Sequence, residues 1–256
     1  MKLTEILKTL EKVAPVALSD AFCKKYAMYD NSGIIIDGNA QVNGALFSLD
    51  LSAKAVKQAK ARGYNLIVTH HPAIYGGVSR INADDPIAQC IKSGISVISM
   101  HLNFDAAPEG IDYHLMRGLG GENCEILADI AGGGYGRVYA IQPTKFSEYS
   151  KIVKTAFSTE RALFYGDSGR QVKKVASFCG AGCDDKAIAF AVSNGADVFV
   201  SSDMKHHEIA GLLEKGLNVI HLTHYSAENY GFNKIYNKIA TGLQIPSEYF
   251  TDEDLL

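Results

Sequence analysis

The feature that most restricts the possible folds is a regular alternation of apolar, strand-like segments with short helix-like segments. In the first half of the chain the pattern predicts strands and helices in this order: strand 44–50, helix 53–62, strand 66–69, helix 85–92 and strand 95–100. Gly63 and Gly94 follow the two helices, where a glycine commonly ends a helix. Such alternation favours crossover connections and a largely parallel sheet, whose strand ends form the usual ligand site.

The same alternation recurs later in the chain. There it predicts strand 172–178, helix 185–193, strand 197–200, helix 209–215 and strand 217–222. Because each copy holds several strands, the repeat indicates a duplicated lobe and not a solenoid array. We therefore expect an α/β protein whose residues 1–256 form one compact unit, with approximate lobes 1–130 and 171–256. Residues 131–170 are expected to connect the lobes, and no chemistry is assigned to them.

Composition narrows the class of protein. The 256 residues are 47% hydrophobic and 21% charged, as in ordinary soluble proteins, and no segment approaches the ~20 apolar residues of a membrane span. The net charge of -3 leaves no broad basic surface for nucleic acid, so a small molecule is the better candidate partner. The five cysteines are scattered along the chain, and we expect no secretory leader. Both points favour a reducing cytoplasm. Cys179 and Cys183 lie four apart without a second pair, which favours a structural role.

The histidines gather at the ends of predicted strands. Seven of the eight fall in four clusters, and His114 alone lies elsewhere, on a predicted helix. The pair His70 and His71 ends an apolar run and precedes Pro72, which cannot donate to a strand and disfavours a helical His71. Considered alone, the pair also fits a simpler interpretation, in which one histidine caps the strand and the other is a hydrogen-bonded polar group.

Carboxylates accompany these imidazoles. His224 and Glu228 are four residues apart, as are His101 and Asp105, and this spacing places two side chains on one face of a helix. Nitrogen and oxygen ligands without thiolates favour zinc, manganese, iron or cobalt. A set of five exceeds the three protein ligands of a catalytic zinc and suits two metals that share a carboxylate and a water. The candidate ligands are His70, His71, Asp105, His224 and Glu228.

Several motifs together resemble those of one family. The motifs are YDNSG at 29–33, LDL at 49–51, THHP at 69–72, HLNFDAA at 101–107, GAD at 195–197, HH at 206–207 and HYSAE at 224–228. In their order and spacing the chain resembles, over nearly its whole length, the GTP cyclohydrolase 1 type 2 homologs, also called Nif-three-like proteins. The resemblance implies two similar, intertwined α/β/α lobes, a dinuclear metal centre in the cleft between them, and a ring-shaped homohexamer.

The resemblance also implies roles for the candidate ligands. Carried over residue by residue, His71 and Asp105 hold one metal, His70 and His224 hold the other, and Glu228 bridges the two. His101 matches a position beside the centre. The chain departs from the family pattern at three positions that line the site: Tyr29 replaces a tryptophan, Thr223 replaces a glycine, and Ala227 replaces a small hydroxyl residue. These departures bear on the identity of the substrate more than on metal binding.

The expected chemistry follows from such a centre. Two divalent ions about 3.5–4 Å apart lower the pKa of a bridging water and polarise a substrate. We therefore expect a dinuclear metal-dependent hydrolase of a small molecule, in which a bridging hydroxide attacks carbon or phosphorus. The family name suggests ring opening of a nucleotide such as GTP. His101 or His207 is the expected proton shuttle, because imidazole titrates near neutral pH.

Other interpretations stay open at this stage. A metal-dependent phosphoesterase would release phosphate where ring opening releases formate, and a metal-binding oligomeric scaffold or regulatory protein would not turn over substrate. His206 and His207 are equally well explained as one hydrogen-bonding partner of the site and one solvated side chain. His221 is expected to fill a core position. Asp30 and Asn31 either orient a metal-bound water or cap their own turn.

Overall fold

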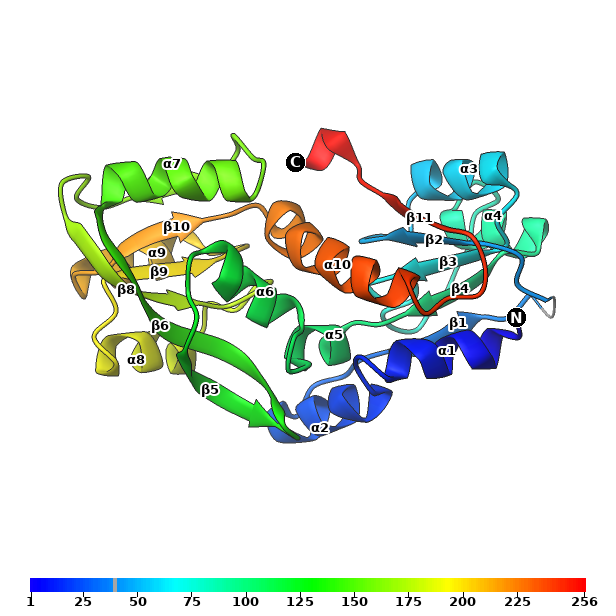
Figure 1. Cartoon of the computed structure of the whole chain (residues 1–256), viewed down its shortest axis with the longest axis horizontal. Coiled ribbons are helices and arrows are strands. Elements are labelled where there is room, and N and C mark those ends of the chain that lie inside the picture. The colour runs from blue at the N-terminus through cyan, green and yellow to red at the C-terminus, as the bar shows by residue number, and fades with distance from the viewer. Residues whose placement is uncertain (39–40) are drawn as a thin grey trace. The chain divides into compact units, whose positions relative to one another are not determined.

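The computed structural model describes residues 1–38 and 41–256, which form two compact units (Figure 1). The first unit contains Met1–Gly110 and Phe232–Asp252, and the second contains Ile111–Gly231 and Glu253–Leu256. The chain therefore leaves the first unit, builds the second, and returns, so the units are intertwined in sequence.

Within the described residues, the sheet of the first unit has five strands in the order β1, β4, β3, β2, β11. Strands β2, β3, β4 and β11 run parallel, and β1 is antiparallel to β4. The prediction of a largely parallel sheet is confirmed here. The bounds are β1 (Gly33–Ile36), β2 (Ala45–Ser48), β3 (Leu66–Thr69), β4 (Ser96–Ser99) and β11 (Ser247–Phe250).

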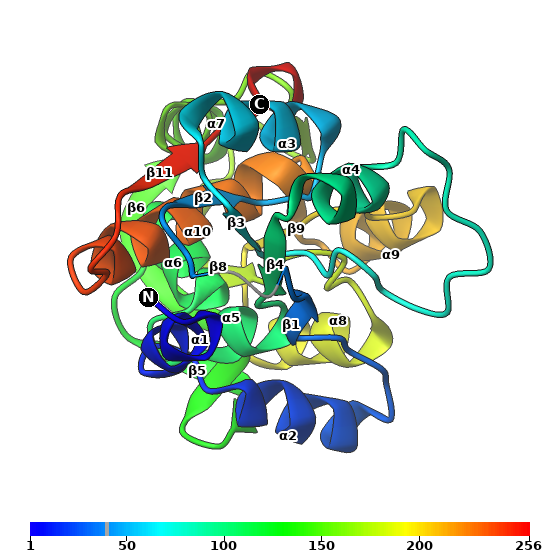
Figure 2. The ribbon, with the colours of Figure 1, turned by 90° about the vertical axis from the view of Figure 1, so that its right-hand side faces the viewer.

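Helices cover both faces of this sheet. Val56 of α3 packs with Leu46 and Ile67 in the core on one face, while Phe47 contacts Phe232 and Tyr236 of α10 on the other. Figures 1 and 2 show α1 on the same side as this part of α10. The bounds are α1 (Leu3–Glu11), α2 (Val16–Tyr26), α3 (Ala53–Arg62), α4 (Pro86–Ser93), α5 (Leu102–Ala106) and α10 (His224–Ala240).

The sheet of the second unit has six strands in the described part of the chain, in the order β5, β6, β8, β9, β10, β7. Strands β8, β9 and β10 run parallel, whereas β5, β6 and β7 join by antiparallel pairing. The bounds are β5 (Cys124–Ile130), β6 (Gly133–Lys145), β7 (Leu163–Tyr165), β8 (Gln171–Ser177), β9 (Val198–Ser201) and β10 (Asn218–His221).

Helices α8 and α9 bury one face of this sheet, where Ala187 and Leu212 pack with Phe199. Helices α6 and α7 contact β6 and β8. The bounds are α6 (Ile111–Gly118), α7 (Phe146–Ala156), α8 (Asp185–Ser193), α9 (His206–Glu214) and the short helix η1 (Glu253–Leu255).

The two units share one plan, which agrees with an internal duplication. In the first unit, helices α3 and α4 connect the neighbouring parallel strands β2, β3 and β4. In the second unit, helices α8 and α9 connect β8, β9 and β10 in the same way. The chain is thus an α/β protein of two similar units. The segment 131–170 supplies β6, α7 and β7, and β6 and β7 pair with β8 and β10 in the sheet of the second unit.

Two expectations drawn from composition concern a membrane span and the cysteines. No helix among residues 1–38 and 41–256 is long and apolar enough to cross a membrane. Within the described residues all five cysteines are free thiols, and Cys179 and Cys183 are both buried in the second unit.

Candidate metal centre

The turn after β3 positions the double histidine. The backbone N–H groups of His70 and His71 both donate to the carbonyl of Leu49, at 3.2 and 3.0 Å, which ties the end of β3 to the residue that follows β2. His70 is completely buried, whereas a quarter of the His71 side chain is exposed. The two imidazoles of this pair therefore occupy different environments, although their ring centroids are only 4.8 Å apart.

A cluster of ligand-type atoms lies beside the turn. One ligand atom each from His70, His101 and Asp105 lie within 4.8 Å of one another. The Nε2 atom of His70 is 3.5 Å from Oδ1 of Asp105. His101 directly precedes α5 and Asp105 lies within it, so the short helix after β4 carries the carboxylate to the imidazole. The structure brings these three predicted residues together in the first unit.

His71 is oriented by a carboxylate that follows the neighbouring strand. Its Nδ1 atom lies 2.7 Å from Oδ1 of Asp50, which can only accept, so the hydrogen atom is on Nδ1. The same reasoning applies to His70, whose Nδ1 donates to the carbonyl of Met100 at 3.0 Å. Such partners fix the tautomer of metal-ligating histidines.

His101 has a buried acidic partner. Its Nδ1 atom lies 2.7 Å from Oδ1 of Asp30, and Ser32 donates to the second carboxylate oxygen of Asp30 at 2.6 Å. Burial raises the pKa of Asp30, but hydrogen bonds from His101 and Ser32 outweigh it and hold the pKa at about 2. Asp30 is thus an ionised group that orients His101, a role that the sequence did not suggest for it.

The second unit supplies the pair at the start of α10. His224 is the first residue of this helix, and its Nε2 atom lies 2.9 Å from Oε2 of Glu228, one turn later. The predicted spacing therefore places the two side chains together. The Nδ1 atom of His224 lies 2.5 Å from Oδ2 of Asp203. Glu228 is buried, with 2% of its surface exposed.

A glycine makes room for this pair. Gly180 has a φ of +62°, and a Cβ atom at that position would lie 2.9 Å from Oε1 of Glu228. The turn is held from both sides: Cys179 N–H donates to Asp112 at 3.1 Å, and the Tyr135 hydroxyl donates to the carbonyl of Cys179 at 2.7 Å. A glycine is required here because the backbone must approach the carboxylate closely.

The histidines described above, His70, His71, His101 and His224, share one arrangement. In each, a carboxylate or carbonyl oxygen lies within hydrogen-bond distance of Nδ1, and carboxylates also lie close to Nε2 of His70 and His224. Imidazoles that are oriented through Nδ1, together with carboxylates, form a donor set that suits a divalent ion such as zinc, manganese, iron or cobalt. The residues present therefore fit a metal.

Sequence reasoning missed the residues that orient the ligands, and Asp50 and Asp203 are the clearest cases. Each lies two residues past the end of one strand, and its histidine follows the next strand in the chain, 21 residues later. This repeated spacing is the signal that could have identified them.

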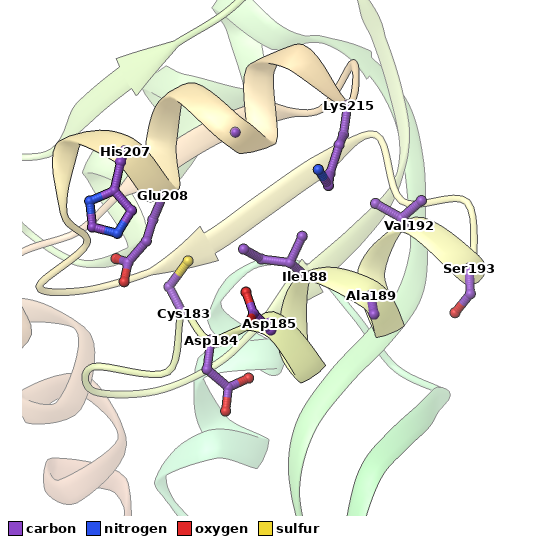
Figure 3. Close-up of a pocket in the computed structure, with 11 residues that line it drawn as sticks. Cys183, Asp184, Asp185, Ile188, Ala189, Val192, Ser193, His207, Glu208 and Lys215 are labelled. Carbon is purple, nitrogen blue, oxygen red and sulfur yellow. The ribbon is translucent and has the colours of Figure 1, made fainter.

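The remaining histidines lie elsewhere. His206 and His207 begin α9 and are exposed. His207 lines a groove of about 550 Å³ between α8 and α9, across from Cys183 and Asp184 (Figure 3). His221 ends β10 and is partly buried, and burial lowers its pKa, opposed by the negative charge of Asp203. His114 lies on α6 against Tyr113. The catalytic role of His207 stays a prediction.

Comparison with known proteins agrees with the sequence motifs. A relative from Clostridium perfringens, named GTP cyclohydrolase 1 type 2 homolog, is 28% identical over 264 residues, which cover 99% of this chain and 97% of the relative. A relative of the same name from Archaeoglobus fulgidus is 25% identical and covers 97% of each chain. The predicted resemblance to proteins of this name is confirmed.

Solved structures with the same fold include two at 25% identity. The Staphylococcus aureus hypothetical protein SA1388 matches with a TM-score of 0.85, covering 98% of this chain and 97% of that one. Reduced HcgD from Methanocaldococcus jannaschii matches with a TM-score of 0.81, covering 98% of each chain. Residues 1–251 match the family described as Duf34/NIF3 (NGG1p interacting factor 3). The chain therefore belongs to the Duf34/NIF3 family.

Proposed function

We propose that this protein is a dinuclear metal-dependent hydrolase of a small molecule. The observation that carries the proposal is the shared arrangement of His70, His71, His101 and His224, in which an acceptor oxygen lies 2.5 to 3.0 Å from every Nδ1 and fixes the ring. As the family resemblance implies, His71 and Asp105 would hold one ion, His70 and His224 would hold the other, and Glu228 would serve both. When bound, the ions supply Lewis acidity and a water of lowered pKa.

The protein's own groups orient the site and move protons. Asp50 and Asp203 hold His71 and His224 through Nδ1, so each ring keeps one orientation. His101 is the proposed proton shuttle in the first unit. Its Nδ1 is held by the ionised Asp30 while 18% of its side chain is exposed, so Nε2 can exchange a proton with substrate or solvent.

The substrate class rests on the names of relatives. Because those relatives are named GTP cyclohydrolase 1 type 2 homolog, we propose a nucleotide whose ring is opened, with release of formate. Hydrolysis of a phosphoester, with release of phosphate, is the competing outcome of the same test. A homohexamer and a cytoplasmic location belong to the same proposal.

The test begins with metal analysis. Protein purified without chelator is expected to carry two divalent ions per chain by elemental analysis, and Asp105→Asn is expected to lose at least one of them. Glu122→Ala, which removes an exposed carboxylate, is the matched control and should keep both. Fewer than one ion per chain in the wild type would contradict the dinuclear centre.

The same metal-loaded sample is then screened for turnover. Formate release from purine nucleotides supports ring opening, and phosphate release from phosphoesters supports the phosphoesterase. His101→Ala should lower either rate by about 100-fold or more, as expected for a general acid or base, without loss of metal. A loaded wild type that hydrolyses nothing in a broad screen would refute the hydrolase and favour a metal-binding scaffold.

A further inference from the structure

Two tyrosines project from the surface of the first unit. Tyr29 is 58% exposed and Tyr75 is 52% exposed. Their rings contact each other edge to face, with centroids 6.2 Å apart and an interplanar angle of 89°. This is a preferred geometry for an aromatic pair. The pair therefore keeps a defined shape while a large part of each ring stays open to solvent.

Hydrogen bonds fasten the two tyrosines together. Tyr75 lies in the loop between β3 and α4, which Figure 2 shows running out at the right of the view. Its hydroxyl donates to the carbonyl of Tyr29 at 3.3 Å. Asn31 donates from Nδ2 to the carbonyl of Ile74 at 2.6 Å. The loop is thus attached to the segment that carries Tyr29, and both rings are positioned in advance of any ligand.

The pair is continuous with the candidate metal centre. The Tyr75 ring packs edge to face on His101, with centroids 6.1 Å apart. The His101 ring in turn lies 5.3 Å from that of the buried His70 and 5.9 Å from that of His71. A run of rings therefore leads from the buried ligands to the exposed tyrosines, and all of these residues lie in the first unit.

We propose that Tyr29 and Tyr75 form a platform on which a flat aromatic or heteroaromatic ring of the substrate stacks beside His101. This inference rests on the proposed function, because it assigns the ring to a molecule that reacts at the metal centre. Each side chain offers an aromatic ring and one hydroxyl, so the platform recognises the face of a ring rather than a phosphate or a carboxylate. Stacking of a base on an aromatic side chain is strong and tolerates many ring types.

The test compares two probes that share a sugar and a phosphate but differ in the ring. Binding of guanosine 5′-monophosphate and of ribose 5-phosphate to the metal-loaded full chain is measured by titration calorimetry. The wild type should bind the guanosine probe at least about tenfold more tightly. Tyr75→Ala should lower the affinity for the guanosine probe by about 5- to 100-fold, within the range measured for base stacking, and leave the affinity for ribose 5-phosphate unchanged.

Two variants separate stacking from other effects. Tyr75→Phe keeps the ring and loses only the hydroxyl, so it should retain most of the affinity for the guanosine probe. Ile81→Ala removes another exposed apolar side chain from the same loop and should change neither probe. The platform would be overturned if the wild type bound both probes with equal affinity, or if Tyr75→Ala lost affinity for both probes equally.

Metal content and self-association are measured on the same samples. Normal metal content without a preference for the guanosine probe refutes the platform and leaves the metal centre standing. A preference that Tyr75→Ala removes, in protein that binds no metal, supports the platform and refutes the proposed hydrolase. If Tyr75→Ala instead changes the sedimentation profile and neither affinity, the tyrosines form a contact between copies of the chain and the platform is wrong.

Discussion

Loss of the Asp112 carboxylate should destabilise the second unit more than loss of any surface charge. Asp112 lies on α6 with no exposed surface, and its carboxylate is 3.0 Å from Nε of the equally buried Arg137. It also accepts from the backbone N–H groups of Gly136 at 3.0 Å and Cys179 at 3.1 Å. Asp112→Ala therefore leaves a buried cation and two buried N–H groups without their acceptor.

The expected magnitude follows from those contacts. Removing one partner of a buried ion pair costs about 3–5 kcal/mol. Each buried N–H group that loses its acceptor adds about 1–3 kcal/mol if it finds no water. Because these terms overlap, we expect a loss of about 4 kcal/mol, a large part of the ~5–15 kcal/mol that stabilises most domains.

Urea denaturation followed by circular dichroism measures this loss. With ~1–3 kcal/mol per M of urea, the midpoint of the transition should fall by more than about 1 M. Glu160→Ala is the matched control, because it breaks the ion pair with Lys154 at the surface and should cost less than about 1 kcal/mol. A double variant, Asp112→Asn with Arg137→Met, should recover part of the loss because no unpaired charge stays buried.

The same variant reports on the candidate metal centre. Asp112 holds the N–H group of Cys179, and the next residue, Gly180, lies against Glu228. Asp112→Ala should therefore also lower the metal content of protein that is still folded. A loss of stability below about 1 kcal/mol, with the metal content unchanged, would refute both steps of the reasoning.

Three other predictions follow from single contacts. Asp50→Asn should lower metal affinity by about 10- to 100-fold, measured by competition with a chelator, because the carboxylate that orients His71 is lost; unchanged affinity would contradict that role. The thiols of Cys90 and Cys183 should resist alkylation in folded protein at pH 8 and react on unfolding, because burial raises their pKa values to about 11 and about 12; rapid labelling of the native protein, read by mass spectrometry, would disprove this. Because burial lowers the pKa of His221 below its usual 6.5, the folded state binds fewer protons and should lose stability as the pH falls through 6.5. In His221→Gln, the difference between unfolding free energies at pH 7.5 and pH 5.5 should be smaller than in the wild type.

The secondary structure of the parallel strands was predictable because it depends on local pattern. The predicted strand 66–69 coincides with β3, and the predicted helix 53–62 coincides with α3. The apolar run of β3, buried at every position, and the glycine in left-handed conformation after α3 are both local signals.

The segment 131–170 was harder to predict. Strand β6 mixes buried and exposed positions over 13 residues and contains Gly133, Gly134 and Gly136, which weaken a strand pattern. Its strand conformation is stabilised by pairing with β5 and β8, and such pairing is a property of the folded sheet. The glycines therefore weaken the strand pattern in the first part of β6, which lies between β5 and β8 in the sheet of the second unit.

The sequence by itself determined the type of donor atoms at the candidate metal centre, because residue identity sets whether a ligand is a nitrogen or an oxygen. It also placed the histidines at strand ends and spaced His224 and Glu228 along one helix face. Only the tertiary structure decided which nitrogen of each imidazole is presented, because that depends on acceptors such as Asp50, Asp203 and the carbonyl of Met100, which other strands carry to each ring. These acceptors lie 21 to 30 residues away in the chain, so each contact forms only when neighbouring strands pair in the sheet.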